Sequence, residues 1–396
     1  MTAPPLIDNI RPLDFVRPAS VAELGELIRR AAAENLGLFP IGGQTELQLG
    51  LPPNKPGIAV DMTGFDQVID YPARDMTITV RAGITMGKLQ ALLAAEKQRL
   101  PIDAPNDATL GGIIATNASG PRRYAYGTLR DYVIGISFMT DEGQEVKAGG
   151  RVVKNVAGYD MCKLHIGALG TLGIVTQVTL KVLPTPEDRA QGVFLLGDDE
   201  IPRFLQRVHD SKTRPVCVEL LSGERGGNVD TAHMLVVGFE GNREAVAWQT
   251  ETIQAELAQS SVEINRGDRT VWDSSTVTNQ LIKLSFKSNL LSSALPEFLS
   301  HLLRFPELSW QVHAGNGIVR VDTTADWSLA RAAGMLSKLR EAAVTAQGNL
   351  IITRCPPAWK RELPVWGEPR GDLPLMRKVK QALDPRDLFN PGRYLV

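Results

Sequence analysis

Residues 40–46, Pro-Ile-Gly-Gly-Gln-Thr-Glu, are the segment of this chain best suited to binding an anion. They overlap a short apolar stretch, residues 38–41, which predicts a strand that ends in a glycine turn. Consecutive glycines let several backbone N–H groups point into one concavity, where they can neutralise a pyrophosphate without a lysine. An ordinary strand-to-loop turn is the alternative for this segment taken alone.

Two further glycine-rich segments follow in the same half of the chain. Residues 105–120 contain paired glycines and then Asn117, Ser119 and Gly120. Small residues let a flat ligand approach closely, while amide and hydroxyl groups can contact its polar edges. Residues 149–175 carry glycines too often for a regular helix or strand. Three such loops, separated by strands, predict one extended ligand held at several points, and a dinucleotide has that length.

Several common motifs are absent from the sequence. Gly167, Gly170 and Gly173 do not form a GxGxxG fingerprint, and they precede a strand rather than a helix. Residues 83–88 are one residue short of a P-loop, and Leu89 stands where Ser or Thr would bind magnesium. The sequence also lacks GxSxG and HExxH, so nothing supports a serine hydrolase or a zinc protease.

His313, in Val-His-Ala-Gly-Asn-Gly after a predicted strand, is the histidine best placed for chemistry. Its imidazole can exchange a proton near neutral pH. We expect His165, His209 and His301 to be surface or capping residues, and His233 to open a strand.

The composition excludes several classes of protein. The chain has 396 residues, and its 43 Lys and Arg against 44 Asp and Glu give a formal net charge of −1. Without a basic excess, nucleic acid is not expected as a partner. The three cysteines, Cys162, Cys217 and Cys355, lie far apart, which argues against a disulfide scaffold, a zinc ribbon and an iron–sulfur cluster. No apolar stretch approaches a membrane span and no signal peptide is recognised, so we expect a cytoplasmic protein that could dock at the inner membrane through partners.

The apolar periodicity predicts the elements that position these loops. Ser20 and Glu23 form a capping box that begins a helix. Residues 184–188 resemble a linker, which places a domain boundary near residue 186. Strands are predicted at residues 58–61, 76–81, 133–140, 173–182, 216–221, 233–239, 310–312 and 318–321, and helices at residues 86–97, 243–259, 295–303 and 327–346, with a short one within 109–117. The later elements indicate an α+β domain in which helices cover an antiparallel sheet.

Together, residues 40–45, 108–133 and 149–176 resemble the PCMH-type FAD-binding domains of the vanillyl-alcohol oxidase family, and within it the FAD-binding E subunits of glycolate oxidases. Residues 389–393, Phe-Asn-Pro-Gly-Arg, match the family's tail that returns to the flavin. The resemblance implies an α+β fold. It implies a two-subdomain PCMH-type FAD-binding domain over residues 1–186, an α+β cap domain with an antiparallel sheet over residues 187–355, and a tail over residues 356–396 that returns to the FAD domain.

The resemblance also implies which residues hold FAD. Those expected at the pyrophosphate are Ile41, Gly42, Gly43, Gln44 and Thr45; those expected along the flavin and ribityl chain are Thr109, Gly112, Asn117, Ser119 and Gly120; those expected beside the adenine or the ring are Gly158, Tyr159, Gly173 and Ile174; and Asn390 would close the pocket. On this basis Gly43→Val should abolish FAD retention, because a side chain would fill the space of the phosphates.

Two departures from the family pattern shape the expected chemistry. Relatives that attach the flavin covalently carry a histidine where Gln44 stands, so we predict non-covalent FAD. Related dehydrogenases carry a HAGDGNLH-like sequence whose histidines serve substrate or metal binding, whereas Asn316 and Arg320 replace the acid and the second histidine here. We therefore expect no metal. His313 as base and Arg320 as carboxylate ligand are the candidate catalytic residues, and an interface or structural pair is the alternative.

The expected function is that of the FAD-binding subunit of a multi-subunit glycolate oxidase. The resemblance implies oxidation of a small 2-hydroxy acid, glycolate, to glyoxylate. It also implies two partners, a D-type flavin subunit and an F-type iron–sulfur subunit that receives the electrons. The alternatives are a stand-alone FAD-linked 2-hydroxy-acid oxidase or dehydrogenase and a non-catalytic assembly subunit.

Overall fold

A computed structural model describes residues 5–150, 160–222, 233–257, 262–266 and 281–395, and of residues 262–266 the backbone alone. These residues form two compact units. The first unit comprises Met1–Ser119, Gly127–Thr185 and Pro369–Val396, and the second comprises Gly120–Tyr126 and Pro186–Glu368. The chain therefore passes between the units at four places, after Ser119, Tyr126, Thr185 and Glu368.

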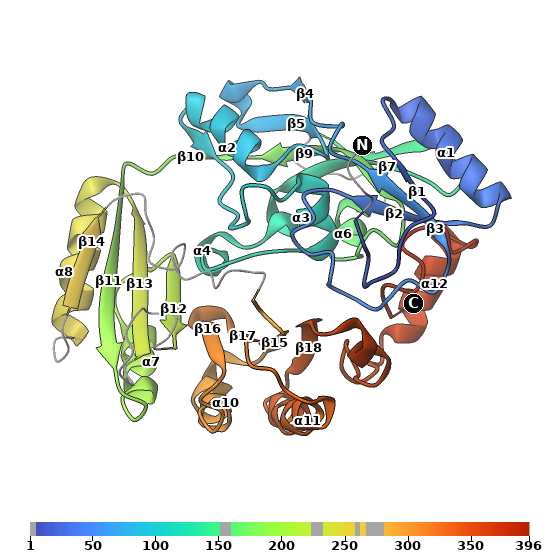
Figure 1. The fold of residues 1–396 in the computed structure, drawn as a ribbon. Coiled ribbons are helices and arrows are strands. Elements are labelled where there is room, and N and C mark those ends of the chain that lie inside the picture. Colours follow the sequence, from blue (N-terminus) through green and yellow to red (C-terminus); the bar gives the residue numbers. More distant parts are fainter. Residues whose placement is uncertain (1–4, 151–159, 223–232, 258–261, 267–280, 396) are drawn as a thin grey trace. The chain divides into compact units, whose positions relative to one another are not determined.

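The first unit contains a three-stranded parallel sheet in the order β1-β3-β2 (Figure 1). Its strands are β1 (Asp14–Val16), β2 (Gly37–Ile41) and β3 (Gly57–Asp61). Helix α1 (Val21–Ala33) connects β1 to β2.

The start of α1 follows the predicted capping box. The Ser20 hydroxyl accepts a hydrogen bond from the N–H of Glu23, whose carboxylate accepts from the N–H of Ala19. Leu24 and Ile28 of the apolar face are fully buried in the core that α1 shares with β2 and β3. The predicted helix and its buried face are confirmed.

A five-stranded antiparallel sheet in the order β4-β5-β9-β7-β8 completes the sheets of the first unit. Its strands are β4 (Val68–Asp70), β5 (Thr77–Arg81), β7 (Val133–Met139), β8 (Glu145–Gly149) and β9 (Ile174–Lys181). A small pair joins β6 (Gln98–Arg99) to β10 (Leu183–Pro184). The helices of this part are α2 (Met86–Ala95), α3 (Leu110–Thr116), α5 (Leu129–Tyr132), α6 (Met161–His165) and the 3₁₀ turn η1 (Ala73–Asp75).

The C-terminal tail packs against the first sheet through α12 (Leu373–Leu383) and the residues after it. Leu38 in β2 exchanges backbone hydrogen bonds with the tail, donating to the carbonyl of Leu388 and accepting from the N–H of Asn390. Lys380 of α12 is buried and donates to the carbonyl oxygens of Thr171 and Phe389. The tail is thus an integral part of the first unit.

The second unit is built on an eight-stranded antiparallel sheet in the order β14-β11-β13-β12-β16-β17-β15-β18 (Figure 1). Its strands are β11 (Asp188–Leu196), β12 (Cys217–Leu221), β13 (His233–Gly241), β14 (Val262–Arg266), β15 (Leu284–Asn289), β16 (Ser309–His313), β17 (Ile318–Thr323) and β18 (Asn349–Arg354). Its helices are α4 (Arg123–Tyr126), α7 (Ile201–Asp210), α8 (Arg243–Leu257), α10 (Leu295–Leu302) and α11 (Leu329–Thr345), with 3₁₀ turns η2 (Ser292–Ala294), η3 (Ala314–Asn316) and η4 (Pro357–Arg361).

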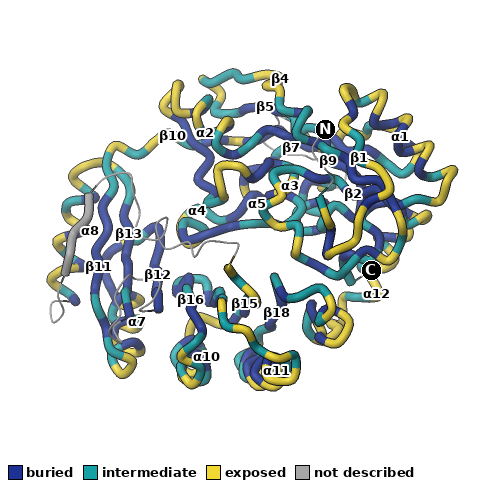
Figure 2. The backbone as a smooth tube through the Cα atoms, in the orientation of Figure 1, coloured by how far each residue is buried: buried dark blue, intermediate teal, exposed yellow. Residues whose placement is uncertain are grey.

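The two faces of this sheet differ because neighbouring strand residues point in opposite directions. On one face, Gly192 of β11 lies against Ile253 of α8. On the other, Val193 belongs to a buried cluster that Tyr126 of α4 packs against. Figure 2 shows the central strands as largely buried, in line with a sheet covered on both faces there.

The segment 120–126 is held to the second unit by a buried carboxylate. Glu240 of β13 accepts a hydrogen bond from the Tyr126 hydroxyl at 2.9 Å. It also lies 3.7 Å from Arg122 and 3.5 Å from Arg189, measured between side-chain nitrogen and oxygen. Two cations and a hydroxyl around one carboxylate compensate its desolvation.

The predicted elements are confirmed within a few residues, but many others were not predicted. The unpredicted strands are β1, β4, β6, β8, β10, β11, β14, β15 and β18, and the unpredicted α-helices are α4, α5, α6, α7 and α12. No helix in the described ranges is long and apolar enough to cross a membrane.

Candidate functional site

The turn after β2 requires glycine because another loop passes directly against it. A Cβ on Gly42 would lie 1.9 Å from Oγ1 of Thr109, and one on Gly43 would lie 1.9 Å from the carbonyl oxygen of Asp107. The expected effect of Gly43→Val therefore had the wrong physical reason. The space beside Gly43 is occupied by backbone of the neighbouring loop, not kept free for phosphates.

Gln44, rather than either glycine, has the left-handed conformation in this turn, with φ of 60°. Such a conformation costs a non-glycine residue about 1–3 kcal/mol and is found mostly where function requires it. In the described part of the chain, the backbone N–H groups of Gly42, Gly43, Gln44 and Thr45 donate to no protein acceptor. Successive unpaired N–H groups in a turn form a cradle for an anion.

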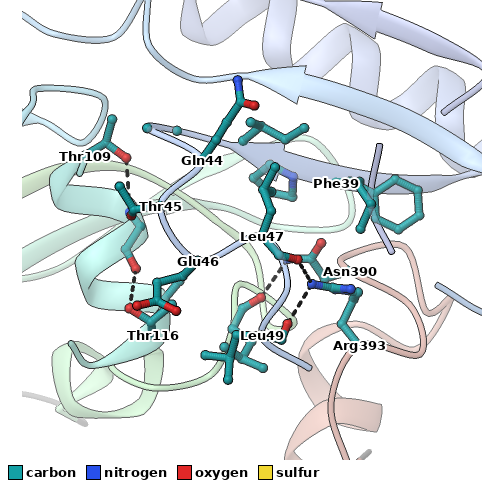
Figure 3. Close-up of a pocket in the computed structure, with 18 residues that line it drawn as sticks. Phe39, Gln44, Thr45, Glu46, Leu47, Leu49, Thr109, Thr116, Asn390 and Arg393 are labelled. Atoms are coloured by element: carbon teal, nitrogen blue, oxygen red, sulfur yellow. Dashed lines mark hydrogen bonds between the residues drawn. The ribbon is translucent and has the colours of Figure 1, made fainter. Parts of the chain in front are cut away.

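This cradle lies at the edge of two adjoining pockets in the first unit. The first pocket lies between the 42–49 loop, α3 and the tail, with a cavity volume of about 110 Å³ (Figure 3). The second has a cavity volume of about 70 Å³ and extends to His165 and the start of β9. The two pockets share the wall formed by Gly42, Thr109 and Gly112.

The structure places most of the expected cofactor residues at these pockets. Ile41, Gly42, Gly43, Gln44, Thr45, Thr109, Gly112 and Asn390 line the first pocket, and Gly173 and Ile174 line the second. Asn117 lines neither pocket and instead ends α3 with φ of 51°, its buried Oδ1 without a partner among the described residues. Ser119 also lines neither pocket, Gly120 belongs to the second unit, and Gly158 and Tyr159 lie outside the described residues.

Two tail residues complete the first pocket, and the sequence suggested only one of them. Asn390 donates from Nδ2 to the carbonyl oxygen of Leu169 at 2.6 Å. Arg393, which we did not predict, donates to the carbonyl oxygens of Leu47 and Leu49 (Figure 3). It also pairs with Asp8. The guanidinium thereby fixes the loop that follows the glycine turn. Its place in the Phe-Asn-Pro-Gly-Arg sequence was the available signal.

His165 does not lie at the surface, so that expectation was wrong. Its side chain is 2% exposed at the end of α6, lines the second pocket and packs on Phe138 with ring centroids 4.1 Å apart. Burial lowers the pKa of His165 to about 4, because a charged imidazole would lose its hydration. His165 is therefore neutral at physiological pH.

In the second unit, His313 is paired with a carboxylate that the sequence analysis missed. His313 Nδ1 lies 2.7 and 2.8 Å from the two carboxylate oxygens of Glu219, and both side chains are buried. Glu219 also accepts from Nε2 of Gln311 at 2.8 Å. An ionised carboxylate can only accept, so the proton lies on Nδ1 and the lone pair on Nε2. That Nε2 has no partner in the described ranges.

Arg320 shares a sheet face with His313. In the register of β16 and β17, Arg320 lies opposite Gln311, two residues before His313. Cross-strand partners and residues two apart along a strand point to the same side. Lys287 of β15 lies opposite Arg320 on its other side. A histidine, a carboxylate and two cations therefore share this face of the sheet.

Comparison with known protein families identifies the first unit. Residues 12–149 match the family model described as FAD binding domain, and residues 367–394 match the model described as FAD linked oxidases, C-terminal domain. The chain is an FAD-linked oxidoreductase. The predicted cofactor and fold class are confirmed, and the matched residues include the glycine turn and the returning tail.

The chain is similar to several proteins whose names are known. It is 27% identical to D-2-hydroxyglutarate dehydrogenase of Xanthomonas citri pv. viticola over 96% of this chain and 89% of that protein. It is 35% identical to glycolate oxidase subunit GlcE of Escherichia coli over 41% of this chain and 46% of that protein. A solved structure of alkyldihydroxyacetonephosphate synthase shares the fold, with a TM-score of 0.70, 18% identity and coverage of 96% of this chain and 77% of that one.

The residues of the first unit fit an FAD molecule. The unpaired N–H groups after β2 suit the pyrophosphate, and two adjoining pockets begin at this turn. Nε2 of His165, at the second pocket, is buried without a partner among the described residues, so a ligand there could supply its missing hydrogen bond. Across the described residues, no group of three or more His, Cys, Asp or Glu side chains could hold a metal ion.

Proposed function

We propose that this chain oxidises a small 2-hydroxy acid to the 2-oxo acid as the FAD-binding subunit of a glycolate oxidase complex. The partners would be a D-type flavin subunit and an F-type iron–sulfur subunit. Similarity to GlcE and to a dehydrogenase of a 2-hydroxy acid supports this substrate class. Glycolate is the substrate we favour, with glyoxylate as the product.

The hydrogen bond between Glu219 and His313 carries the proposal. Oxidation of an alcohol carbon requires a base that accepts the hydroxyl proton. The hydrogen bond from Nδ1 to Glu219 leaves the lone pair on Nε2 of His313 available for this role. Proton transfer to Nε2 would leave an imidazolium, whose charge the buried carboxylate of Glu219 stabilises at 2.7 Å. Bound FAD would supply the acceptor for the hydride that leaves carbon 2.

Arg320 is the proposed ligand of the substrate carboxylate. A guanidinium can bind a carboxylate through two parallel hydrogen bonds, which fixes the orientation of the acid as well as its position. Lys287, its neighbour across the sheet, adds a second positive charge on the same face. The pair would favour substrates that carry a carboxylate next to the hydroxyl.

The proposed cofactor contacts include residues at the two pockets and others that the family resemblance implies. We propose that the turn Ile41–Thr45 binds the pyrophosphate and that Asn390 closes the site. The flavin and ribityl chain would be followed by Thr109, Gly112, Asn117, Ser119 and Gly120. The adenine or the ring would be flanked by Gly158, Tyr159, Gly173 and Ile174. Gln44 stands at the position of covalent attachment in some relatives, and its amide cannot form that bond, so FAD would be bound non-covalently. Denaturation in acid should release all of the flavin into the supernatant.

Electrons must leave the chain through a partner or a small acceptor. The three cysteines are buried and form no disulfide with one another, and an iron–sulfur cluster usually needs four thiolates. This supports transfer to the iron–sulfur partner. The match with the Xanthomonas dehydrogenase over nearly the whole of both chains favours a second candidate, a stand-alone FAD-linked dehydrogenase.

The test is turnover of glycolate and D-lactate with a dye acceptor, by the purified chain and by the chain co-expressed with its partner subunits. We expect His313→Gln and Glu219→Gln to lower kcat by at least about 100-fold, with flavin content unchanged. His209→Gln, on an exposed position of α7, is the control. Full activity of His313→Gln would overturn the proposed base. Activity of the isolated chain equal to that of the complex would favour the stand-alone dehydrogenase, and no turnover in either form would favour an assembly role.

A further inference from the structure

His165 is a buried polar side chain that the fold itself does not explain. It is 2% exposed, and its Nε2 has no hydrogen-bond partner in the part of the chain that the structure describes. Its ring packs against Phe138, and a Cβ on Gly173 would lie 3.5 Å from its Cε1. A phenylalanine or leucine would satisfy these apolar contacts equally well. The imidazole therefore brings a polar atom that the packing does not need.

An unpaired buried polar atom is costly, which points to a partner outside the protein. Burying such a group without a hydrogen bond costs roughly 1–3 kcal/mol in mutational data. Buried polar groups are paired in the great majority of native structures. Because His165 lines the second pocket, a bound molecule can reach it.

The second pocket has the character of the closed end of the dinucleotide site. Its walls include Met62, Ala82 and Ile174, all at most 6% exposed. The first pocket is instead bordered by Gln44 and Glu46, both exposed. The flavin ring must remain accessible, because it exchanges a hydride with substrate and electrons with an acceptor. The adenine takes no part in the chemistry and can be enclosed.

We propose that Nε2 of His165 forms a hydrogen bond with the adenine ring of FAD, and that His165 is a selectivity residue for the adenine half of the cofactor. Adenine offers ring nitrogens that accept and an amino group that donates. A neutral imidazole can present Nε2 as donor or as acceptor, depending on its tautomer. Either pairing satisfies the unpaired atom. The inference depends on the cofactor and not on the identity of the substrate.

The experiment compares three ligands on the full-length apoprotein: FAD, ADP, which shares the adenine and pyrophosphate, and FMN, which lacks the adenine. Dissociation constants are measured by flavin fluorescence and by calorimetry. We expect His165→Phe to weaken FAD and ADP by the same factor, roughly tenfold, and to leave FMN unchanged. Phe138→Leu is the matched control, because it alters the packing around His165 and keeps the imidazole. It should not change the ratio of FAD affinity to FMN affinity.

Several outcomes would overturn the proposal. Unchanged FAD and ADP binding in His165→Phe would mean that water or a protein group satisfies Nε2. Equal losses for FAD and FMN, with ADP unaffected, would place the flavin against His165 instead. If His165→Phe does not fold, ¹⁵N NMR of the wild-type imidazole gives the answer independently. Its Nε2 resonance should shift on addition of ADP and not of FMN, and a shift with FMN alone would contradict the assignment.

Discussion

Asn390 donates from Nδ2 to the carbonyl oxygen of Leu169 across 2.6 Å, although the two residues are 221 positions apart in the chain. Both line the first pocket, so this bond joins the tail to the loop before β9 at that pocket. Asn390 also has φ of 44°, a left-handed conformation that asparagine tolerates better than most residues. One side chain therefore provides both the turn of the tail and its attachment.

These two roles of Asn390 can be separated by substitution. Asn390→Gly keeps the left-handed turn and loses the hydrogen bond, whereas Asn390→Ala loses both. We expect Asn390→Gly to lower the free energy of unfolding by about 1–2 kcal/mol and Asn390→Ala to lower it further. Urea unfolding of the apoprotein, with FAD retention on gel filtration, measures both effects. Equal stability of the two variants would contradict a role for the backbone conformation.

Gly43 and Gly334 should respond in opposite ways to alanine. A Cβ on Gly43 would overlap the carbonyl of Asp107, so Gly43→Ala should destabilise the chain by roughly 1–3 kcal/mol and weaken FAD binding. Gly334 lies in the interior of α11 with nothing within 4 Å of the added atom. Gly334→Ala should therefore stabilise the chain by about 0.5–1 kcal/mol, because alanine favours helix. Thermal unfolding of both variants tests the pair, and a stabilising Gly43→Ala would refute the close approach of the loops.

The pKa of His165 predicts a specific loss of stability in acid. The pKa is lowered to about 4 in the folded chain from an ordinary value of 6.5, so below pH 6.5 the unfolded state binds a proton that the folded state does not. The stability this provides is complete above about pH 6.5 and is lost as the pH falls to about 4. The total is roughly 3 kcal/mol at 1.36 kcal/mol per pKa unit. His165→Phe should flatten the stability curve of the apoprotein in this window, and parallel curves for the two proteins would contradict the burial effect.

Lys380 should be among the most sensitive positions of the tail. Its ammonium lies 2.6 Å from the fully buried carboxylate of Asp384 and donates to the carbonyls of Thr171 and Phe389. Lys380→Met would leave the Asp384 charge buried without its partner, at a cost of about 3–5 kcal/mol. The double variant Lys380→Met, Asp384→Asn should recover part of this loss, because it removes the uncompensated charge. If the double variant is as unstable as the sum of the two single variants, the charge pair is not the cause.

The sequence predicted the glycine turn of the first unit better than the Glu219–His313 pair of the second, because the signals for the turn are local. The capping box at Ser20 and the glycine turn at Gly42 and Gly43 depend on neighbouring residues. His165 could not be assigned, because its burial depends on contacts with Phe138 of β7 and with Gly173 just before β9, and the sequence does not reveal these contacts. Glu219 had one overlooked signal, a lone acid in the apolar run Val-Cys-Val-Glu-Leu-Leu. Its pairing with His313 depends on the register of β12 and β16, which the sequence does not reveal.

Helix α12 shows a different limit. The tail residues 356–396 contain many prolines and glycines, and the sequence analysis predicted no helix among them. The helix nevertheless forms between them over Leu373–Leu383, with a proline in its first turn, where no N–H is needed. The helix can form because its proline lies in the first turn, and the number of prolines nearby does not prevent it.

The placement of residues 120–126 in the second unit has a consequence for gene dissection. No uninterrupted stretch of codons specifies that unit, because Arg122 and Tyr126, two partners of Glu240, are encoded inside the FAD-binding half. A fragment expressed from codons 186–368 would contain Glu240 without its partners Arg122 and Tyr126. Swapping this module between homologous enzymes would therefore require transplanting two separate DNA segments, and chimaeras joined only at residue 186 should be recovered as insoluble protein.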